Sequence, residues 1–304
     1  MIPDPFPLIA APPTPFADDG SLNLQAVEPL AELLAGNGVA GAFVAGTTGE
    51  GVSMTLPERR DLLARWAEVA GDRLEVIAHV GANCLAEARE LAAHAAACGA
   101  AGIGYMPPNY FKAATLAGLA DCCAQVASSA ADLPFYYYHI PHMTGVELNL
   151  HELLPLLAER IDRFGGAKFT HSDLADFALC LAEGGGNLRM LFGRDEMLLA
   201  GLAAGAVGAV GTSYTFAAPL YARLLRAVRQ GDMAAARAQQ ARAATLLKTL
   251  REFGGLVAVK SAVRLAGVDC GPNRLPLATL SPAEEDRFGQ RLEDRGLLEG
   301  FSRL

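Results

Sequence analysis

The chain has 304 residues, of which 52% are hydrophobic and 19% charged, so it is long enough for one large domain or two ordinary ones. Its formal net charge of −8 argues against a protein that binds nucleic acid or an anionic membrane. The six cysteines are scattered without metal-ligand spacing, and the first residues lack the regions of a signal peptide. We therefore expect a cytoplasmic protein with reduced thiols.

Short apolar strands alternate with longer helical patterns along most of the chain. We predict strands at Leu8–Ala11, Gly41–Ala45, Glu75–Val80, Gly102–Met106, Phe135–Tyr138, Gly166–Thr170, Met190–Phe192 and Ala206–Val210. The predicted helices are Leu24–Leu34, Pro57–Val69, Ala86–Cys98, Thr115–Ser128, Leu150–Leu157, Asp173–Ala182, Asp195–Ala203 and Ala217–Val228. Eight such units predict an α/β fold, a (β/α)8 TIM barrel, with a doubly wound open sheet as the alternative.

After about residue 230 the pattern becomes wholly helical. Predicted helices lie at Asp232–Glu252, Leu256–Ala266 and Pro282–Leu297, and no flexible linker precedes them. We therefore predict a barrel over residues 1–229 and a C-terminal helical extension over residues 230–304 that packs on it. The uncharged stretch Met197–Ala222 is long enough to cross a bilayer, but its four glycines and Pro219 favour a buried helix followed by a buried strand.

Lysine is rare in this chain, and one lysine lies in an unusual place. The four lysines are Lys112, Lys168, Lys248 and Lys260, and Lys168 falls in the middle of a small, apolar predicted strand. A charged ammonium is poorly solvated there, and desolvation is one route to the neutral amine that a Schiff-base nucleophile requires. The alternative is a lysine at a strand end whose amine reaches solvent along an apolar stem.

Other polar residues follow predicted strands at their C-terminal ends, where a barrel of this kind carries its chemistry. The second strand runs into Gly46-Thr47-Thr48-Gly49-Glu50-Gly51, a turn that can direct N–H groups and hydroxyls at a carboxylate or phosphate. In the fifth strand, alternation places Tyr136 and Tyr138 on one face and Tyr137 on the other. The seventh ends in Gly193-Arg194-Asp195-Glu196, whose carboxylates either serve the site or cap a helix.

His139 and His142 could be read as a pair of metal ligands. Pro141 lies between them, so they do not share a helical face, and no acidic third ligand is close in sequence. We therefore prefer packing of a loop and predict no metal site.

Three of these features together resemble a known family. They are the Gly46-Thr47-Thr48-Gly49-Glu50 turn, Tyr138 placed 30 residues before Lys168, and the run Tyr138-x-Ile140-Pro141-x-x-Thr144-Gly145. The combination resembles the pyruvate-dependent class I aldolase superfamily, which includes dihydrodipicolinate synthase and N-acetylneuraminate lyase, over nearly the whole chain. Within it, the stretches Phe135–Pro141, Gly166–Phe169 and Phe192–Glu196 are most similar to the animal-type N-acetylneuraminate lyases.

The resemblance implies a mechanism. Lys168 would form an imine with a 2-keto acid, Thr47 and Thr48 would hold its carboxylate, and Tyr138 would move protons, with Thr48 also in the catalytic set. Cleavage would release pyruvate and an aldehyde sugar. No metal or organic cofactor would be needed, because the lysine supplies the electrophile.

The resemblance also implies how the rest of the substrate is bound. Contacts to a hydroxyl-rich tail would come from Thr170, Gly193, Asp195, Glu196 and Thr212. Met143 stands where the synthase has an arginine for an acidic substrate, so N-acetylneuraminate is the expected substrate. Three alternatives stay open: an aldolase or dehydratase for another 2-keto-3-deoxy sugar acid, dihydrodipicolinate synthase, and a non-catalytic keto-acid or sugar sensor. The family further implies a homotetramer in which Tyr110 reaches a neighbouring subunit's site.

Overall fold

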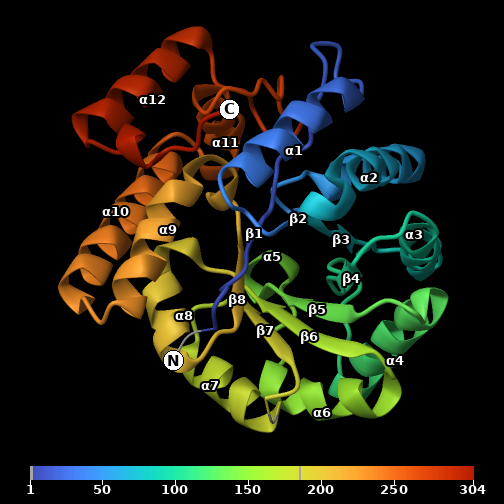
Figure 1. Ribbon diagram of the computed structural model, residues 1–304. Helices are drawn as coiled ribbons and strands as arrows, with labels where there is room; N and C mark the ends of the chain where they lie inside the picture. The colour runs from blue at the N-terminus through green and yellow to red at the C-terminus, as the bar shows by residue number, and fades with distance from the viewer. Residues whose placement is uncertain (1–2, 185) are drawn as a thin grey trace.

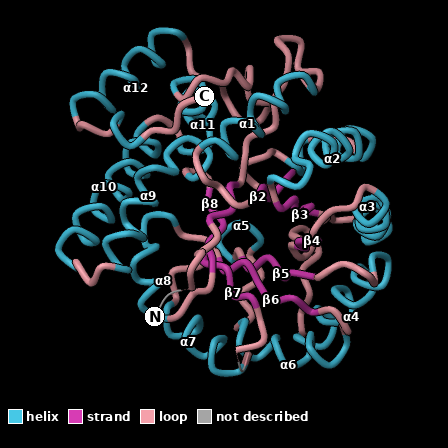
Figure 2. Tube along the Cα trace, viewed as in Figure 1, coloured by secondary structure: helices cyan, strands magenta, loops and turns pink. Residues whose placement is uncertain are grey.

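The computed structural model describes residues 3–184 and 186–304. Its parallel strands form a closed barrel in which each strand pairs with the next and β8 returns to β1 (Figures 1 and 2). The strands are β1 (Leu8–Ala10), β2 (Gly41–Val44), β3 (Glu75–His79), β4 (Gly102–Tyr105), β5 (Phe135–His139), β6 (Phe164–Phe169), β7 (Arg189–Phe192) and β8 (Gly208–Gly211). The predicted barrel is confirmed, and the doubly wound alternative is wrong.

Helices follow the strands and surround the barrel (Figure 1). They are α1 (Val27–Gly36), α2 (Leu56–Ala70), α3 (Leu85–Ala97), α4 (Leu116–Ala127), α5 (Pro141–Thr144), α6 (Leu150–Arg160), α7 (Leu174–Glu183), α8 (Leu198–Ala204) and α9 (Tyr214–Arg229). The predicted helix from Asp195 instead begins with a 3-10 turn, Asp195–Met197, before α8. The short helix α5 was not predicted; it begins at Pro141, whose fixed φ suits a first helical turn.

Capping residues fix where several helices begin. Thr55 and Glu58 form a reciprocal capping box at the start of α2. Asp173 accepts hydrogen bonds from two backbone N–H groups at the start of α7. These caps satisfy N–H groups that have no partner inside the helix, and so they set where each strand-to-helix loop must end.

The barrel interior is filled by side chains and is separate from the larger core between strands and helices. The inner cluster consists of Ile9, Phe43, Ile77, Met106, Tyr136, Tyr138, Ile140, Leu191 and Val210. Tyr137 belongs to the outer core, so the predicted alternation along β5 is confirmed. At the N-terminal end of the barrel, Arg189 pairs with Glu75 and lies beside the Tyr136 hydroxyl. In barrels of this kind active sites lie at the opposite end, where the strands have their C-termini.

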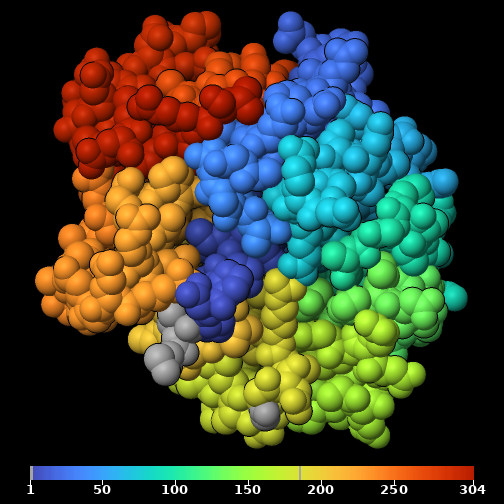
Figure 3. Space-filling model, viewed as in Figure 1, coloured from blue at the N-terminus to red at the C-terminus, as the bar shows by residue number. Residues whose placement is uncertain are grey.

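The C-terminal residues form α10 (Met233–Glu252), α11 (Val259–Leu265) and α12 (Pro282–Asp294). Helix α10 packs along α9 and against the Asp195–Met197 turn. Figure 3 shows the red C-terminal residues lying against the blue N-terminal part, where the Asn37 amide donates to the Arg303 carbonyl over 3.0 Å. The expected boundary between residues 229 and 230 falls at the end of α9.

The stretch Met197–Ala222 contains α8, β8 and the first part of α9, so the predicted buried helix and strand are confirmed. Across residues 3–184 and 186–304, none of the helices combines the length and apolar character that a membrane span requires.

Candidate active site

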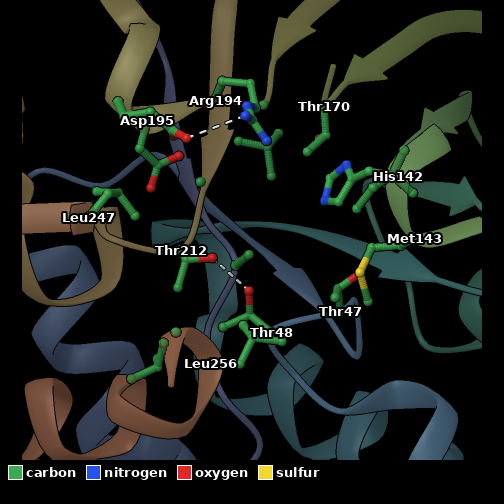
Figure 4. A pocket seen from close by; sticks show the side chains of 18 of the residues that line it. Thr47, Thr48, His142, Met143, Thr170, Arg194, Asp195, Thr212, Leu247 and Leu256 are labelled. Carbon is green, nitrogen blue, oxygen red and sulfur yellow. Dashed lines mark hydrogen bonds and ion pairs between the residues drawn. The ribbon is translucent and has the colours of Figure 1, made fainter. Parts of the chain in front are cut away.

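A cavity of about 320 Å³ opens at the C-terminal ends of the strands. Its walls include most of the residues expected in the site: Thr47, Thr48, Tyr138, Lys168, Thr170, Gly193, Asp195, Glu196 and Thr212. Figure 4 shows that Arg194 and Asp195 lie on one side of this cavity and Thr47 and Thr48 on the other. The fold thus brings residues from β2, β5, β6, β7 and β8 to one place.

Lys168 points into the barrel. Its side chain is only 4% exposed, and it pairs in register with Tyr138 on the neighbouring strand. The Nζ atom lies 4.0 Å from the centre of the Tyr138 ring and 4.2 Å from that of Phe43. The alternative prediction, in which the amine reaches bulk solvent, is therefore wrong. The amine lies at the wall of the cavity, close to two aromatic rings.

The two threonines of the turn have different neighbours. The Thr47 hydroxyl lies 3.3 Å from the Tyr138 hydroxyl, whereas the Thr48 hydroxyl lies 2.7 Å from that of Thr212 (Figure 4). Thr48, expected in the catalytic set, thus contacts Thr212, which directly follows β8, and Thr47 is the threonine next to the tyrosine. A proton can pass between the Thr47 and Tyr138 hydroxyls because each group both donates and accepts.

Asp195 is buried in the wall of the cavity, with 4% of its surface exposed. Its carboxylate accepts from the Ser213 backbone N–H at 2.8 Å and from the Ser213 hydroxyl at 2.5 Å. Burial raises the pKa of Asp195 to about 6, although the two hydrogen bonds from Ser213 oppose this. Gly211 allows this close approach, because a Cβ there would lie 2.0 Å from a carboxylate oxygen. The Oδ2 atom of this carboxylate is therefore already hydrogen-bonded within the protein.

Glu196 is nearer the mouth and is flanked by cations. Its carboxylate lies 3.5 Å from the Arg194 guanidinium and 3.4 Å from that of Arg251 on α10. The buried Thr170 hydroxyl also lines the cavity, and only glycine fits at position 193, since a Cβ would collide with that hydroxyl. The far end of the cavity thus offers both hydrogen-bond donors and acceptors.

Tyr110 is not part of this cavity within one chain. Its side chain is 79% exposed and packs edge-on against Phe111, which is 85% exposed. The loop is held from below, where the Asn83 side-chain oxygen accepts from the Tyr110 backbone N–H at 3.2 Å. An exposed aromatic pair of this kind is typical of a surface that contacts another chain.

The two histidines weighed as metal ligands lie in different environments. His142 lines the cavity beside Met143, while His139 is buried and stacks on Phe169. Burial lowers the pKa of His139 to about 4, so the ring is neutral near pH 7. Within the described part of the chain, no group of three or more His, Cys, Asp or Glu side chains could hold a metal ion.

His79 lies beside the candidate lysine and tyrosine and was not predicted from the sequence. The ring is buried at the end of β3 and stands edge-on to Tyr138, with centroids 5.8 Å apart. Its Nδ1 lies 2.9 Å from the Ala45 carbonyl, to which it donates. Burial and the nearby Arg59 hold its pKa well below the usual range, so the ring is neutral. His79 is two residues after Ile77 in the same strand, so both lie on one face of the sheet. That spacing was the signal that could have placed His79 inside the barrel.

The wall contributed by the C-terminal extension was not predicted from the sequence either. Leu247, Leu250, Arg251 and Leu256 all line the cavity, and Figure 4 shows Leu247 and Leu256 closing the side below Asp195. No signal in the sequence joins these residues to the strand ends. The extension is therefore a structural part of the site.

Comparisons with known proteins cover nearly the whole chain. The model of the dihydrodipicolinate synthetase family matches residues 5–295. N-acetylneuraminate lyase of Gallus gallus is 41% identical over 279 residues, which are 90% of this chain and 91% of that protein. The Homo sapiens lyase is 38% identical over 296 residues, covering 96% and 92%. The solved structure of Proteus mirabilis N-acetylneuraminate lyase has a TM-score of 0.93 at 36% identity, covering 96% of this chain and 99% of that one.

Proposed function

The chain belongs to the dihydrodipicolinate synthetase family, and on that premise we propose that it is a Schiff-base lyase that cleaves N-acetylneuraminate to pyruvate and N-acetylmannosamine. The observation that carries the proposal is the buried Lys168 amine, set between the Phe43 and Tyr138 rings at the wall of the cavity. The relatives that bear the name of this lyase, at 38–41% identity, support the choice of substrate.

In the proposed reaction, the Lys168 amine attacks the ketone carbon of the substrate and water leaves, giving an iminium. The bond between C3 and C4 then breaks. Its electron pair becomes the C2–C3 double bond of an enamine, while the π pair of the iminium moves to the nitrogen. As the C4 hydroxyl becomes the aldehyde, its proton passes to Tyr138, which gives up its own hydroxyl proton through Thr47 toward the carboxylate end. The same relay returns a proton to C3 of the enamine, and hydrolysis then releases pyruvate and restores the amine. Because the iminium is the electron sink, the reaction needs no other cofactor.

The turn after β2 holds the substrate carboxylate in this proposal. Thr47 and Thr48 supply hydroxyls, and the glycine-rich backbone supplies N–H groups that suit an anion. Thr47 also has a second role, as a proton relay. Its hydroxyl lies 3.3 Å from that of Tyr138 and can pass a proton between the carboxylate end of the substrate and C4.

The polyhydroxylated tail would lie against Thr170, Gly193, Asp195, Glu196 and Thr212, which also line the cavity. Carboxylates accept well from sugar hydroxyls. Met143, also in the wall, carries no charge to meet an acidic aldehyde, which disfavours the synthase reaction.

A second candidate has its own supporting observation. Arg194 and Arg251 flank Glu196 at the mouth of the cavity, so the tail site offers cations as well as acceptors. Those cations would suit another 2-keto-3-deoxy sugar acid with an acidic tail. Lys168 and Tyr138 would keep their roles in that case.

The test combines product release with trapping of the imine. Incubation with N-acetylneuraminate should release pyruvate, and borohydride in the presence of pyruvate should add a pyruvate-derived mass to the peptide that contains Lys168. Lys168→Ala should abolish both, whereas Asp195→Ala and Glu196→Ala should weaken cleavage more than they affect the pyruvate adduct. An adduct that survives Lys168→Ala would overturn the mechanism. Turnover of a shorter keto acid alone would overturn only the substrate.

The proposal extends to assembly. We infer a cytoplasmic homotetramer in which the exposed Tyr110 of one subunit reaches the site of another. Light scattering after size exclusion tests the oligomer. A Tyr110→Ala variant that stays tetrameric and fully active would remove Tyr110 from the catalytic set.

A further inference from the structure

The turn that lines the keto-acid end of the cavity has unusual backbone geometry at both ends. Ala45 and Glu50, at φ 57° and 52°, are the non-glycine residues with positive φ among those that the structure describes. L-residues rarely adopt this left-handed conformation, and it persists only where the surroundings enforce it. Ala45 and Glu50 bracket Gly46–Gly49, so contacts outside the turn must hold Thr47 and Thr48 in place.

The C-terminal extension supplies the contacts at the Glu50 end. The Lys260 amine of α11 lies 2.9 Å from one oxygen of the Glu50 carboxylate, and these side chains are only 4% and 2% exposed. The second carboxylate oxygen accepts from the Arg274 backbone N–H at 2.8 Å. Lys260 is itself fixed, since it donates to the Pro272 carbonyl at 2.6 Å and lies 4.3 Å from the centre of the Phe16 ring.

The remaining contacts keep the two ends of the turn together. His79 donates to the Ala45 carbonyl at 2.9 Å, and the Thr14 hydroxyl donates to the Gly49 carbonyl at 2.6 Å. Gly51 passes so close to the Ala45 carbonyl that an added Cβ would lie 1.9 Å from its oxygen. With these neighbours fixed, the Glu50 side chain is the connection through which the extension reaches the turn.

We propose that Lys260 is a positioning residue for the keto-acid carboxylate, acting through Glu50 on the turn that carries Thr47 and Thr48. A buried ion pair adds little net stability but enforces one geometry strongly, because an unpaired charge is not tolerated there. The extension thereby sets the affinity for the keto acid. This inference rests on the proposed function, since it requires the turn to bind a carboxylate.

The test compares two ketones that differ in the carboxylate. Pyruvate and hydroxyacetone are titrated against the full-length protein, and the adduct with Lys168 is trapped by borohydride. Lys260→Met leaves Glu50 without its cation. The half-saturating pyruvate concentration should rise roughly tenfold, the effect of losing one set of well-placed hydrogen bonds. Trapping of hydroxyacetone, which has no carboxylate to position, should not change.

Two further variants keep the result interpretable. Arg295→Met removes an ion pair with Glu252 inside the extension, away from the turn, and should change neither titration. If Lys260→Met does not fold, the double variant with Glu50→Gln, which leaves no buried charge unpaired, replaces it with the same selective rise expected.

Three outcomes would overturn the inference. Titrations equal to those of the wild type would show that Lys260 does not act on the turn. Equal loss for both ketones would make its role purely structural. If the wild-type protein does not prefer pyruvate over hydroxyacetone, or if Thr48→Ala keeps that preference, the turn is no carboxylate site and the proposed function fails as well.

Discussion

The buried carboxylate of Asp195 makes folding stability depend on pH in a direction that can be measured. Burial raises its pKa from 3.8 to about 6. Between these values the native protein binds a proton that the unfolded chain has lost, so stability falls as pH rises. Each tenfold difference in proton affinity is worth about 1.4 kcal/mol, so the ionised carboxylate costs roughly 3 kcal/mol above pH 6.

Asp195→Asn removes this titration while keeping the shape of the side chain. Relative to the wild type, the free energy of unfolding of the variant should rise by roughly 1.5 kcal/mol between pH 5 and 7.5, because about half of the total lies in that range. Weaker hydrogen bonds with Ser213 add an offset that does not vary with pH. Urea unfolding at several pH values, followed by circular dichroism, gives the difference.

Glu58 provides a control, because its pKa is shifted in the opposite direction to that of Asp195. The Arg274 guanidinium holds the pKa of Glu58 down to about 2, so its stabilising contribution is complete above its ordinary pKa of 4.5 and is lost as pH falls toward 2. The difference between Glu58→Gln and wild type should therefore stay constant between pH 5 and 7.5. If the Asp195→Asn difference is equally constant, the argument from burial is refuted.

Two other substitutions test the site and its packing. Tyr138→Phe keeps the ring but removes the hydroxyl, so pyruvate release should fall by roughly 10²–10⁴ while borohydride still traps an adduct at Lys168; cleavage within about twofold of wild type would assign the tyrosine to packing. Gly211→Ala would place a Cβ 2.0 Å from the Asp195 carboxylate and should cost about 1–3 kcal/mol in urea unfolding. Gly289→Ala, with open space around it in α12, should cost nothing, and equal effects would contradict the steric argument.

Much of the barrel could be predicted because its strands are short and apolar between polar turns. The strand that carries Lys168 is an example: small residues surround one lysine, and alternation fixes the face on which that lysine lies. The same rule placed Tyr136 and Tyr138 on one face and Tyr137 on the other, and the structure shows that the first face is the inner one. In a barrel the C-terminal ends of all strands lie at one mouth. The barrel fold alone therefore predicts that the candidate residues at these ends lie close together.

The contribution of α10 could not be predicted. The periodicity of a helix shows which face is apolar but not which surface that face covers, and Leu247 lies far along the chain from Lys168. Nor could the sequence show which threonine meets Tyr138. That choice depends on the positive φ of Ala45 and Glu50, which local preference disfavours and long-range contacts impose.

Under the proposed function, the wall formed by Leu247, Leu250 and Leu256 would help to select the substrate, while the residues proposed to break the bond lie on the barrel. Leu247 and Leu250 lie on α10, and Leu256 lies in the 3-10 turn Gly255–Ala258 that follows it. Neither segment belongs to the sheet, so exchanging these leucines for smaller or polar residues reshapes the cavity without disturbing a strand. A lineage with the proposed function could therefore drift toward new sugars through its last 75 or so residues while the barrel keeps Lys168 and Tyr138. Directed evolution has the same opportunity: a library confined to these three positions explores substrates while the proposed catalytic residues stay fixed.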